Sequence, residues 1–203
     1  MSRSIDFLGM KDKIIYAHGS ITDLELLKRV VADYEIEQIY HMAVFGLVKR
    51  ANISPIPVWR TNIEGTWNVM EAARDCDAAV LYMSTDKVYG DHGDAPYQED
   101  FALRGANVYD CSKACGDMIA RSYHHVYGLK VTIIRMCNAY GPADLDSRLV
   151  PNTLRSCLAG KNPIVYNGIN YKREWIFIDD VAEALTLVMK SIDKVNGRIY
   201  NLG

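Results

Sequence analysis

The sequence predicts an α/β fold in which helices cover both faces of a parallel sheet. Apolar runs of strand length alternate with segments of helical period, which is the pattern of successive strand–helix units. Several of these runs are apolar on consecutive residues, as expected of strands buried on both faces. The 203 residues are 49% hydrophobic and 24% charged. This composition is that of one globular unit with a sizeable core.

The first half of the chain alternates as such a fold requires. Residues 13–17 form an apolar run of strand length, and Thr22 and Asp23 can cap the helix that follows it. Pro55 and Pro57 are start signals for a second, longer helix. The expected elements are strands at 13–17, 38–43 and 78–83, a helix with Leu24, Leu27, Val31 and Tyr34 on one face, and a helix at about 58–75.

The second half continues the pattern and then departs from it. A long helix is expected at 108–127 and a strand at 130–136, after which residues 138–142 break the alternation. The last quarter predicts a helix near 148–159, short strands at 163–166 and 175–178, and a helix at 181–190 capped by Asp180. We therefore expect a single α/β unit over 1–203. Residues 1–140 would form mostly the sheet, and residues 141–203 mostly a small C-terminal lobe.

Composition excludes several classes of function. The net charge is −2 without any Lys/Arg run, which argues against a nucleic-acid partner. No segment approaches the ~20 apolar residues of a membrane span, and residues 1–13 show no leader pattern, so we expect a cytoplasmic protein. The five cysteines fit reduced thiols. Cys111 and Cys115 are one helical turn apart but lack a second ligand pair, so no metal site is expected.

Two groups of polar residues can carry chemistry. Tyr109 and Lys113 are four apart on a predicted helix and therefore share a face. An ammonium beside a phenol lowers its pKa and makes the phenolate a usable base, although this spacing also describes an ordinary surface pair. The strand at 78–83 runs directly into Ser84, Thr85, Asp86 and Lys87. Ligands of open α/β sheets bind beyond the carboxyl ends of strands, so these polar side chains are expected to converge with Tyr109.

A family resemblance rests on seven segments that occur in a fixed order. They are His-Met-Ala at 41–43, Thr-Asn-Ile-Glu-Gly-Thr at 61–66, Ser-Thr-Asp-Lys-Val-Tyr-Gly at 84–90, Tyr-Asp-Cys-Ser-Lys at 109–113, Arg-x-x-Asn-x-Tyr-Gly-Pro at 135–142, Arg-Glu-Trp-Ile-Phe-Ile-Asp-Asp at 173–180 and Tyr-Asn-Leu-Gly at 200–203. Together they resemble the extended short-chain dehydrogenase/reductases that act on nucleotide sugars. The resemblance covers almost the whole chain and implies a Rossmann-like fold and NAD as cofactor.

The resemblance also implies roles for individual residues. Tyr109 would be the base toward the sugar 4-hydroxyl, Thr85 would share that hydrogen bond, and Lys113 would lower the phenol pKa while holding the nicotinamide ribose. The residues expected to contact NAD are Ser20, Ile21, Met42, Ala43, Thr61, Tyr109 and Lys113. Asn138, Arg148 and Arg173 would bind the nucleotide sugar, since guanidinium and amide groups match phosphate and hydroxyl oxygens. A homodimer through the helices at 58–75 and 108–127 is also implied.

Asp86 and Lys87 distinguish the subfamilies. Simple 4-epimerases that resemble this pattern carry small or apolar residues there, whereas 4,6-dehydratases need an acid and a base beside the sugar. The Asp-Lys pair resembles the variant of CDP-glucose and some UDP-amino-sugar dehydratases, with Asp86 as acid and Lys87 as base. A lysine can act as base only when its pKa is depressed. A nucleotide-sugar 4-epimerase and a plain solvated turn at 84–87 are the alternatives.

The sequence departs from the family at its start. Family members open with a Gly-x-x-Gly-x-x-Gly turn before a helix that receives the NAD pyrophosphate. Gly9 and Gly19 do not have this spacing, so about forty residues of the family pattern, roughly one strand–helix–strand unit, are unmatched. Ser20 stands where the family has an acidic residue, and Val44 and Phe45 replace a small and a polar residue. We therefore expect weak NAD binding, and a non-catalytic remnant that binds nucleotide sugar or a partner is a further alternative.

Overall fold

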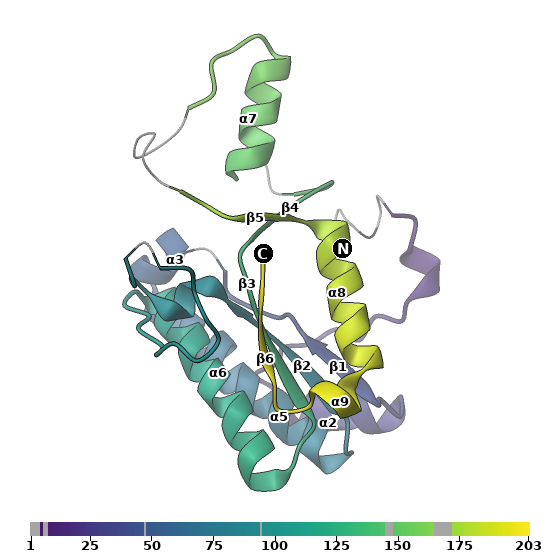
Figure 1. Cartoon of the computed structure of the whole chain (residues 1–203). Helices are drawn as coiled ribbons and strands as arrows, with labels where there is room; N and C mark the ends of the chain where they lie inside the picture. The colour runs from purple at the N-terminus through teal and green to yellow at the C-terminus, as the bar shows by residue number, and fades with distance from the viewer. Residues whose placement is uncertain (1–4, 6–7, 47, 94, 145–147, 165–171) are drawn as a thin grey trace.

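A four-stranded parallel sheet is the centre of the computed structural model, which describes all residues except 1–4, 6–7, 47, 94, 145–147 and 165–171 (Figure 1). The strand order is β1-β2-β3-β6, and every neighbouring pair is parallel. The carboxyl ends of all four strands therefore lie at the same end of the sheet. The strands are β1 (Gln38–His41), β2 (Ala79–Thr85), β3 (Val131–Met136) and β6 (Ile199–Leu202).

Helices cover both faces of this sheet, which confirms the predicted fold class. Alternate side chains of β2 point to opposite faces. Val80 and Tyr82 belong to a core with residues of α5 (Gly65–Asp75) and α6 (Val108–Tyr127). Ala79 and Leu81 belong to a second core with residues of α8 (Ile178–Lys190) and α9 (Ile192–Val195). Both faces of β2 are buried, which explains its continuous apolar sequence.

The helices of the first half follow the predicted signals closely. Helix α2 (Leu24–Asp33) begins at Asp23, whose carboxylate accepts a hydrogen bond from the Leu26 N–H at 3.0 Å. The long helix starts earlier than expected, at Pro55, and is interrupted. It consists of α4 (Pro55–Trp59), a π-helical turn η2 (Arg60–Glu64) and α5. Such single π turns are frequent at functional sites. The sequence analysis did not predict α3 (Val48–Ile53).

A second, smaller sheet stands apart from the first. β4 (Asn138–Tyr140) pairs with β5 (Trp175–Phe177) in parallel, and α7 (Leu149–Leu158) lies beyond them, away from the main sheet (Figure 1). Helix α7 contains no buried residue. This sheet begins at residue 138, near the boundary expected at residue 140, and the division of the chain there stays a prediction. However, β6 and α8, which follow it in sequence, pack on the large sheet.

Two expectations about the elements are wrong, and half of a further expected strand lies outside the described residues. Residues 13–17 are not a strand: a short 3-10 turn, η1 (Lys11–Lys13), is followed by extended chain, and no described strand pairs with it. A strand requires a hydrogen-bonded neighbour, which an apolar run alone cannot supply. Asp180 does not cap α8, which begins at Ile178 after Phe177; Asp180 lies in the first turn, where the helix dipole favours a carboxylate. Of the strand expected at 163–166, residues 165 and 166 fall outside the described residues, and residues 163–164 are not in a strand.

Candidate active site

Thr85, Asp86 and Lys87 lie together at the carboxyl end of β2, as the sequence predicted. The strand continues directly into a 3-10 turn, η3 (Asp86–Tyr89), with Thr85 as its cap. The Thr85 hydroxyl donates to Asp86 Oδ1 at 2.9 Å and accepts from the Lys87 N–H at 3.4 Å. Lys87 Nζ lies 3.6 Å from the same carboxylate oxygen. A hydroxyl, a carboxylate and an ammonium are therefore held within one turn of chain.

Tyr109 approaches this cluster from the first turn of α6. Asn107 caps the helix by accepting the Asp110 N–H at 3.0 Å, which fixes the direction in which Tyr109 leaves it. The pKa of Tyr109 is raised to about 12, mainly by burial and also by the carboxylates of Asp110 and Asp86. A hydrogen bond with Thr85 and the charge of Arg148 act in the opposite direction. The expected meeting of Thr85 with Tyr109 is therefore present.

Lys113 is buried one turn below Tyr109 and faces the sheet. Its Nζ donates to the Met83 carbonyl and lies 4.2 Å from the centre of the Tyr82 ring. Burial lowers the pKa of Lys113 to about 7, with Asp117 opposing the change. The pKa of Tyr109 is raised rather than lowered in this structure, and the expected effect of Lys113 on it stays a prediction. Burial of the phenol determines the direction, and the ammonium is engaged by Met83 and Tyr82.

A buried polar chain lines the neighbouring end of β1. His41 Nε2 lies 3.0 Å from the Thr66 hydroxyl. That hydroxyl donates to the Asn62 carbonyl at 2.7 Å, so Nε2 of His41 is the donor of the first bond. Burial, together with the charge of Lys113, lowers the pKa of His41 to about 3, and the ring is neutral. These residues belong to the motifs at 41–43 and 61–66, but no role was predicted for them from the sequence.

Asn62 connects this chain to α6 from the π-helical turn. Its Nδ2 donates to Ser112 Oγ at 2.8 Å, and its Oδ1 accepts the Phe45 N–H at 2.8 Å. Ser112 in turn donates to the Tyr109 carbonyl at 2.7 Å. The extra residue of a π turn redirects side chains. Here the turn directs Asn62 toward both the chain after β1 and the Tyr109 turn.

The residues expected to contact NAD lie on the β1 side of this cluster. Met42 and Ala43 follow the carboxyl end of β1 and are exposed, and Thr61 is half-buried on the π turn. Ser20 is exposed, while the Ile21 carbonyl accepts a hydrogen bond from Asn68 of α5 at 3.1 Å. The structure places these residues along one side of the site, and their role stays a prediction.

The donor set fits one end of a dinucleotide. A lysine ammonium has three N–H donors, and Lys113 directs one to Met83, which leaves others for ribose hydroxyls. The pyrophosphate end is different, because it requires a glycine-rich turn at a helix N-terminus. Among the described residues, α2 begins with Asp23 and Glu25, whose carboxylates repel phosphate. The nicotinamide end therefore fits, and the described residues provide no glycine-rich pyrophosphate site.

The three residues expected to bind the nucleotide sugar lie in or beside the second sheet and α7: Asn138 in β4, Arg148 just before α7 and Arg173 before β5. Asn138 Nδ2 donates to the Glu174 carbonyl at 3.1 Å and joins β4 to β5. Arg148 Nε lies 3.5 Å from Asp144 Oδ1, and its charge reaches Tyr109. Arg173 donates to the Lys172 carbonyl at 2.9 Å. The structure thus brings Arg148 toward Tyr109, while Asn138 is hydrogen-bonded within its own sheet.

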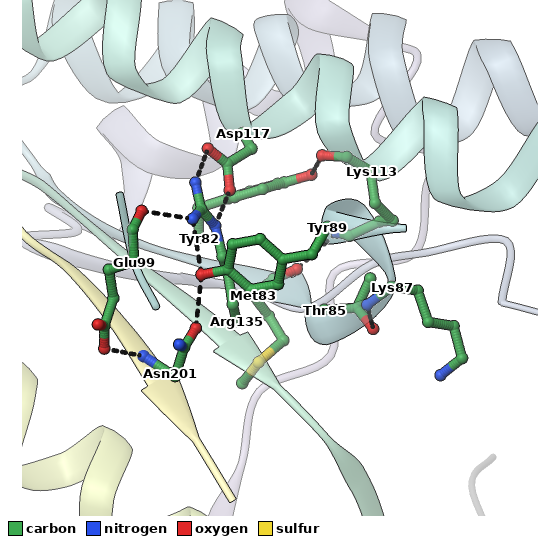
Figure 2. A network of polar contacts seen from close by, with 10 residues as sticks. All are labelled: Tyr82, Met83, Thr85, Lys87, Tyr89, Glu99, Lys113, Asp117, Arg135 and Asn201. Atoms are coloured by element: carbon green, nitrogen blue, oxygen red, sulfur yellow. Dashed lines mark hydrogen bonds and ion pairs between the residues drawn. The ribbon is translucent and has the colours of Figure 1, made fainter. Parts of the chain in front are cut away.

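Sequence reasoning missed a buried network of polar side chains close to Thr85 and Lys87, which Figure 2 shows. Arg135 of β3 binds both carboxylate oxygens of Asp117, at 2.9 and 3.0 Å, and its Nη1 donates to Tyr89 Oη at 2.8 Å and to the Glu99 carbonyl at 2.9 Å. Tyr89 donates to Asn201 Oδ1 at 2.7 Å. Burial is the largest single influence on the pKa of Arg135 and lowers it, but the contacts with Asp117 and Tyr89 together raise the pKa of the guanidinium. The sequence feature that could have indicated this network is Arg135 itself, the charged residue in the mostly apolar strand β3.

The described part of the chain carries neither a metal site nor a disulfide. No three His, Cys, Asp or Glu side chains there are grouped as metal ligands. All five cysteines are free thiols. None of the described helices is long and apolar enough to cross a membrane.

Comparison with known proteins agrees with this geometry. Residues 6–203 match the family described as "NAD dependent epimerase/dehydratase family". The low-salt glycan biosynthesis protein Agl12 of Haloferax volcanii is 34% identical over 93% of this chain. The crystal structure of DesIV, a dTDP-glucose 4,6-dehydratase from Streptomyces venezuelae with NAD bound, superposes on 97% of the chain with a TM-score of 0.87 and 32% identity.

The fold alone does not separate dehydratases from epimerases. A UDP-glucose 4-epimerase of Thermotoga maritima superposes on 95% of the chain with a TM-score of 0.89 at 24% identity. The chain spans 60% of the length of the Haloferax relative, 61% of the Streptomyces chain and 63% of the Thermotoga chain. The choice between the two activities therefore depends on the residues at the site.

Proposed function

The chain belongs to the NAD dependent epimerase/dehydratase family, and from this premise we propose that it acts as a nucleotide-sugar 4,6-dehydratase. One observation carries the proposal. Asp86 and Lys87 form an ion pair at 3.6 Å on the turn that also holds Thr85, next to Tyr109. A 4-epimerase needs no acid and base at this place, whereas elimination of water needs both.

The first step of the proposed reaction is removal of the proton from the sugar 4-hydroxyl. Bound NAD would accept the hydrogen from C4 and later return it to C6. Tyr109 would take the hydroxyl proton, with Thr85 sharing the hydrogen bond. With a pKa of about 12, Tyr109 is protonated at neutral pH and needs a nearby positive charge to become a base. We propose that Lys113 supplies it by turning from the Met83 carbonyl toward the phenol when a ribose is bound.

The second step is loss of water across C5 and C6. The C4 ketone acidifies the C5 proton, a base removes it, and an acid protonates the departing C6 hydroxyl. We assign Asp86 as the acid and Lys87 as the base. The assignment requires that a proton pass from Lys87 to Asp86 within the pair before elimination, which leaves a neutral acid and a neutral amine. After elimination the amine has gained the C5 proton and the acid has lost its own, so the ion pair is restored.

Replacing Lys87 with Met tests this assignment. Methionine keeps most of the apolar stem and removes the amine. The chain is incubated with NAD and CDP-glucose, with dTDP-glucose and UDP-glucose as competitors, and water loss is followed by mass. We expect the variant to lose C5 deuterium exchange with solvent by ~10²–10⁴-fold while C4 oxidation, read as absorbance of the reduced cofactor, continues. If the unmodified chain only interconverts 4-epimers, it is a 4-epimerase and the dehydratase proposal is wrong.

CDP-glucose is the nucleotide sugar that we propose as substrate. The support is the resemblance of segments 36–41, 66–74 and 141–148 to the CDP-glucose branch, together with the Asp-Lys pair. The Streptomyces relative is a dTDP-glucose enzyme, so the competition assay includes both sugars. Preferential conversion of dTDP-glucose would move the assignment to that branch.

A second candidate is a non-catalytic chain that binds nucleotide sugar or a protein partner. The observation in its favour is that no glycine-rich turn for the pyrophosphate occurs among the described residues. Calorimetric titration separates the two candidates. Binding of CDP-glucose without measurable NAD binding supports the second candidate, and stoichiometric NAD binding supports the enzyme.

We also propose a homodimer through the helices of one face. Exposed apolar side chains occur on α4, α5 and α6, namely Ile56, Trp67, Met118, Val126 and Tyr127. Burying them against a second copy would remove apolar surface from water. Light scattering measures the mass, and a monomer at micromolar concentration would contradict the proposal.

A further inference from the structure

Arg135 joins helix α6 to the η3 turn in the buried network of Figure 2, because it contacts both Asp117 and Tyr89. It is 1% exposed and extends from β3 between the η3 turn and α6. Two of its nitrogens bind Asp117 on α6, and the third binds Tyr89 on η3. A planar guanidinium with fixed donor directions holds both partners at a set separation.

Each of the two partners lies on an element that carries part of the proposed chemistry. Tyr89 closes the same 3-10 turn that begins with Asp86 and Lys87. Asp117 lies eight residues after Tyr109, about two turns along α6. We propose that Arg135 is a positioning residue that sets the separation between the Asp86–Lys87 pair and Tyr109. This inference rests on the proposed dehydratase function, in which these two groups must act on adjacent carbons of one sugar.

The Tyr89 hydroxyl is the point at which the turn is fixed. It accepts from Arg135 at 2.8 Å and donates to Asn201 Oδ1 of β6 at 2.7 Å. Asn201 is held in turn, because its N–H donates to the Glu99 carboxylate at 2.8 Å. The η3 turn can therefore rotate only by breaking hydrogen bonds to β3 and β6 together. Movement of the turn would carry Asp86 and Lys87 away from Tyr109.

Stability alone does not account for an arginine at this position. Taking a charged pair out of water costs about as much as the pair regains, and apolar residues of similar volume often stabilise as well. Buried ion pairs are best attested as devices that fix registry. The Arg135–Asp117 pair, with side-chain exposures of 1% and 0%, joins the strand to the helix at one defined register.

Replacing Tyr89 with Phe is the mildest way to test the inference. The ring and its stacking on Tyr97, at 4.9 Å between centroids, are kept, and only the hydroxyl is lost. Thr132→Val is the matched control. Thr132 lies on the same strand as Arg135, is fully buried, and donates its hydroxyl to the Val195 carbonyl at 3.0 Å, which is outside the network.

The first readout is hydrogen exchange of the backbone amides at 86–90, measured by mass spectrometry on the chain without cofactor or sugar. Loss of one hydrogen bond to a charged group should raise exchange there about tenfold in Tyr89→Phe. In Thr132→Val, the same amides should exchange at the unmodified rate even though the melting temperature falls to a similar extent. Equal protection of residues 86–90 in both variants overturns the inference.

The second readout compares the two chemical steps. With NAD and CDP-glucose, Tyr89→Phe should lower the ratio of C5 deuterium entry to C4 oxidation about tenfold, and Thr132→Val should leave that ratio unchanged. Arg135→Lys keeps the charge but not the fork, and should lower the ratio as Tyr89→Phe does. An unchanged ratio in Tyr89→Phe, where oxidation is measurable, overturns the inference. If the unmodified chain dehydrates no sugar, the proposed function fails, and the exchange measurement still decides whether Arg135 and Tyr89 hold the turn.

Discussion

The two parts of the proposed site differ in how much of their geometry the chain fixes by itself. Around β2 and α6, the polar side chains of Thr85, Lys113, Asp117 and Arg135 are at most 5% exposed, and each has a hydrogen-bond partner. In the second sheet and α7, Arg148 and Arg173 are exposed, and α7 has no buried residue. The difference indicates that the part around β2 and α6, to which we assign the catalytic role, is preorganised by the fold. The nucleotide-sugar part would gain its final order from the ligand.

The largest expected effect is on the catalytic part. Tyr109→Phe removes the proposed base without changing the volume of the side chain appreciably, so the helix should remain intact. C4 oxidation should fall by ~10²–10⁴-fold, as is typical when a positioned base is lost. The apparent affinity for the nucleotide sugar should change little, because binding is assigned to the other part. Single-turnover absorbance of the reduced cofactor measures the rate. A variant that oxidises C4 at the unmodified rate removes Tyr109 from the mechanism.

The next prediction concerns how the stability of the chain depends on pH through Lys113, which lies in the buried part around β2 and α6. The pKa of Lys113 is about 7 in the fold, compared with 10.5 ordinarily. Between these values the unfolded chain binds one proton more than the folded chain does, so this group makes the free energy of unfolding rise with pH from about 7 to 10. Below about pH 7 the full cost of the buried ammonium is present. Lys113→Met should therefore be stabilised by a few kcal/mol at neutral and lower pH.

Urea unfolding at several pH values checks this prediction. The difference between the two unfolding free energies should shrink as pH rises, because the unmodified chain recovers stability as Lys113 loses its proton. Lys190→Met is a suitable control, because Lys190 is exposed at the end of α8. Parallel curves for Lys113→Met and the unmodified chain would show that the fold does not keep the Lys113 pKa low.

The catalytic part was also the more predictable part from sequence, for physical reasons. Helix α6 was predicted at the bounds observed, because it has strong apolar periodicity and ends at Gly128, which takes the left-handed conformation. The strand leading to Thr85 was predicted because it is continuously apolar. By contrast, β4 has only three residues, too few for a period to be recognised. Residues 13–17 carried the strand pattern without a partner strand.

Long-range contacts set the limit of sequence reasoning at the site itself. Arg135 is 18 residues from Asp117, 46 from Tyr89 and further still from Asn201, so no local spacing indicates that they meet. The direction of the Tyr109 pKa shift differs from the prediction for a related reason. The four-residue spacing to Lys113 predicted a lowered value, but the spacing contains no information on how deeply the fold buries the phenol. Burial and distant partners are properties of the packed chain.

The smallest expected effect, on Arg148 at the start of α7, tests whether the second part contributes only to binding. Arg148 is exposed, and its charge reaches Tyr109, so it faces the site without belonging to the buried cluster. A guanidinium can bind a pyrophosphate through two parallel hydrogen bonds. Arg148→Gln should raise KM for the nucleotide sugar about 10- to 100-fold, as expected from the loss of one or two charge-assisted bonds, and change kcat by less than about threefold. Arg155→Gln on the same helix is the control, because Arg155 donates to the Pro151 carbonyl of its own helix at 3.3 Å. Initial rates over a range of sugar concentrations separate the two constants. A fall in kcat at constant KM would place Arg148 among the groups that act in the chemical step, and the division of the site into a catalytic and a binding part would then have to be abandoned.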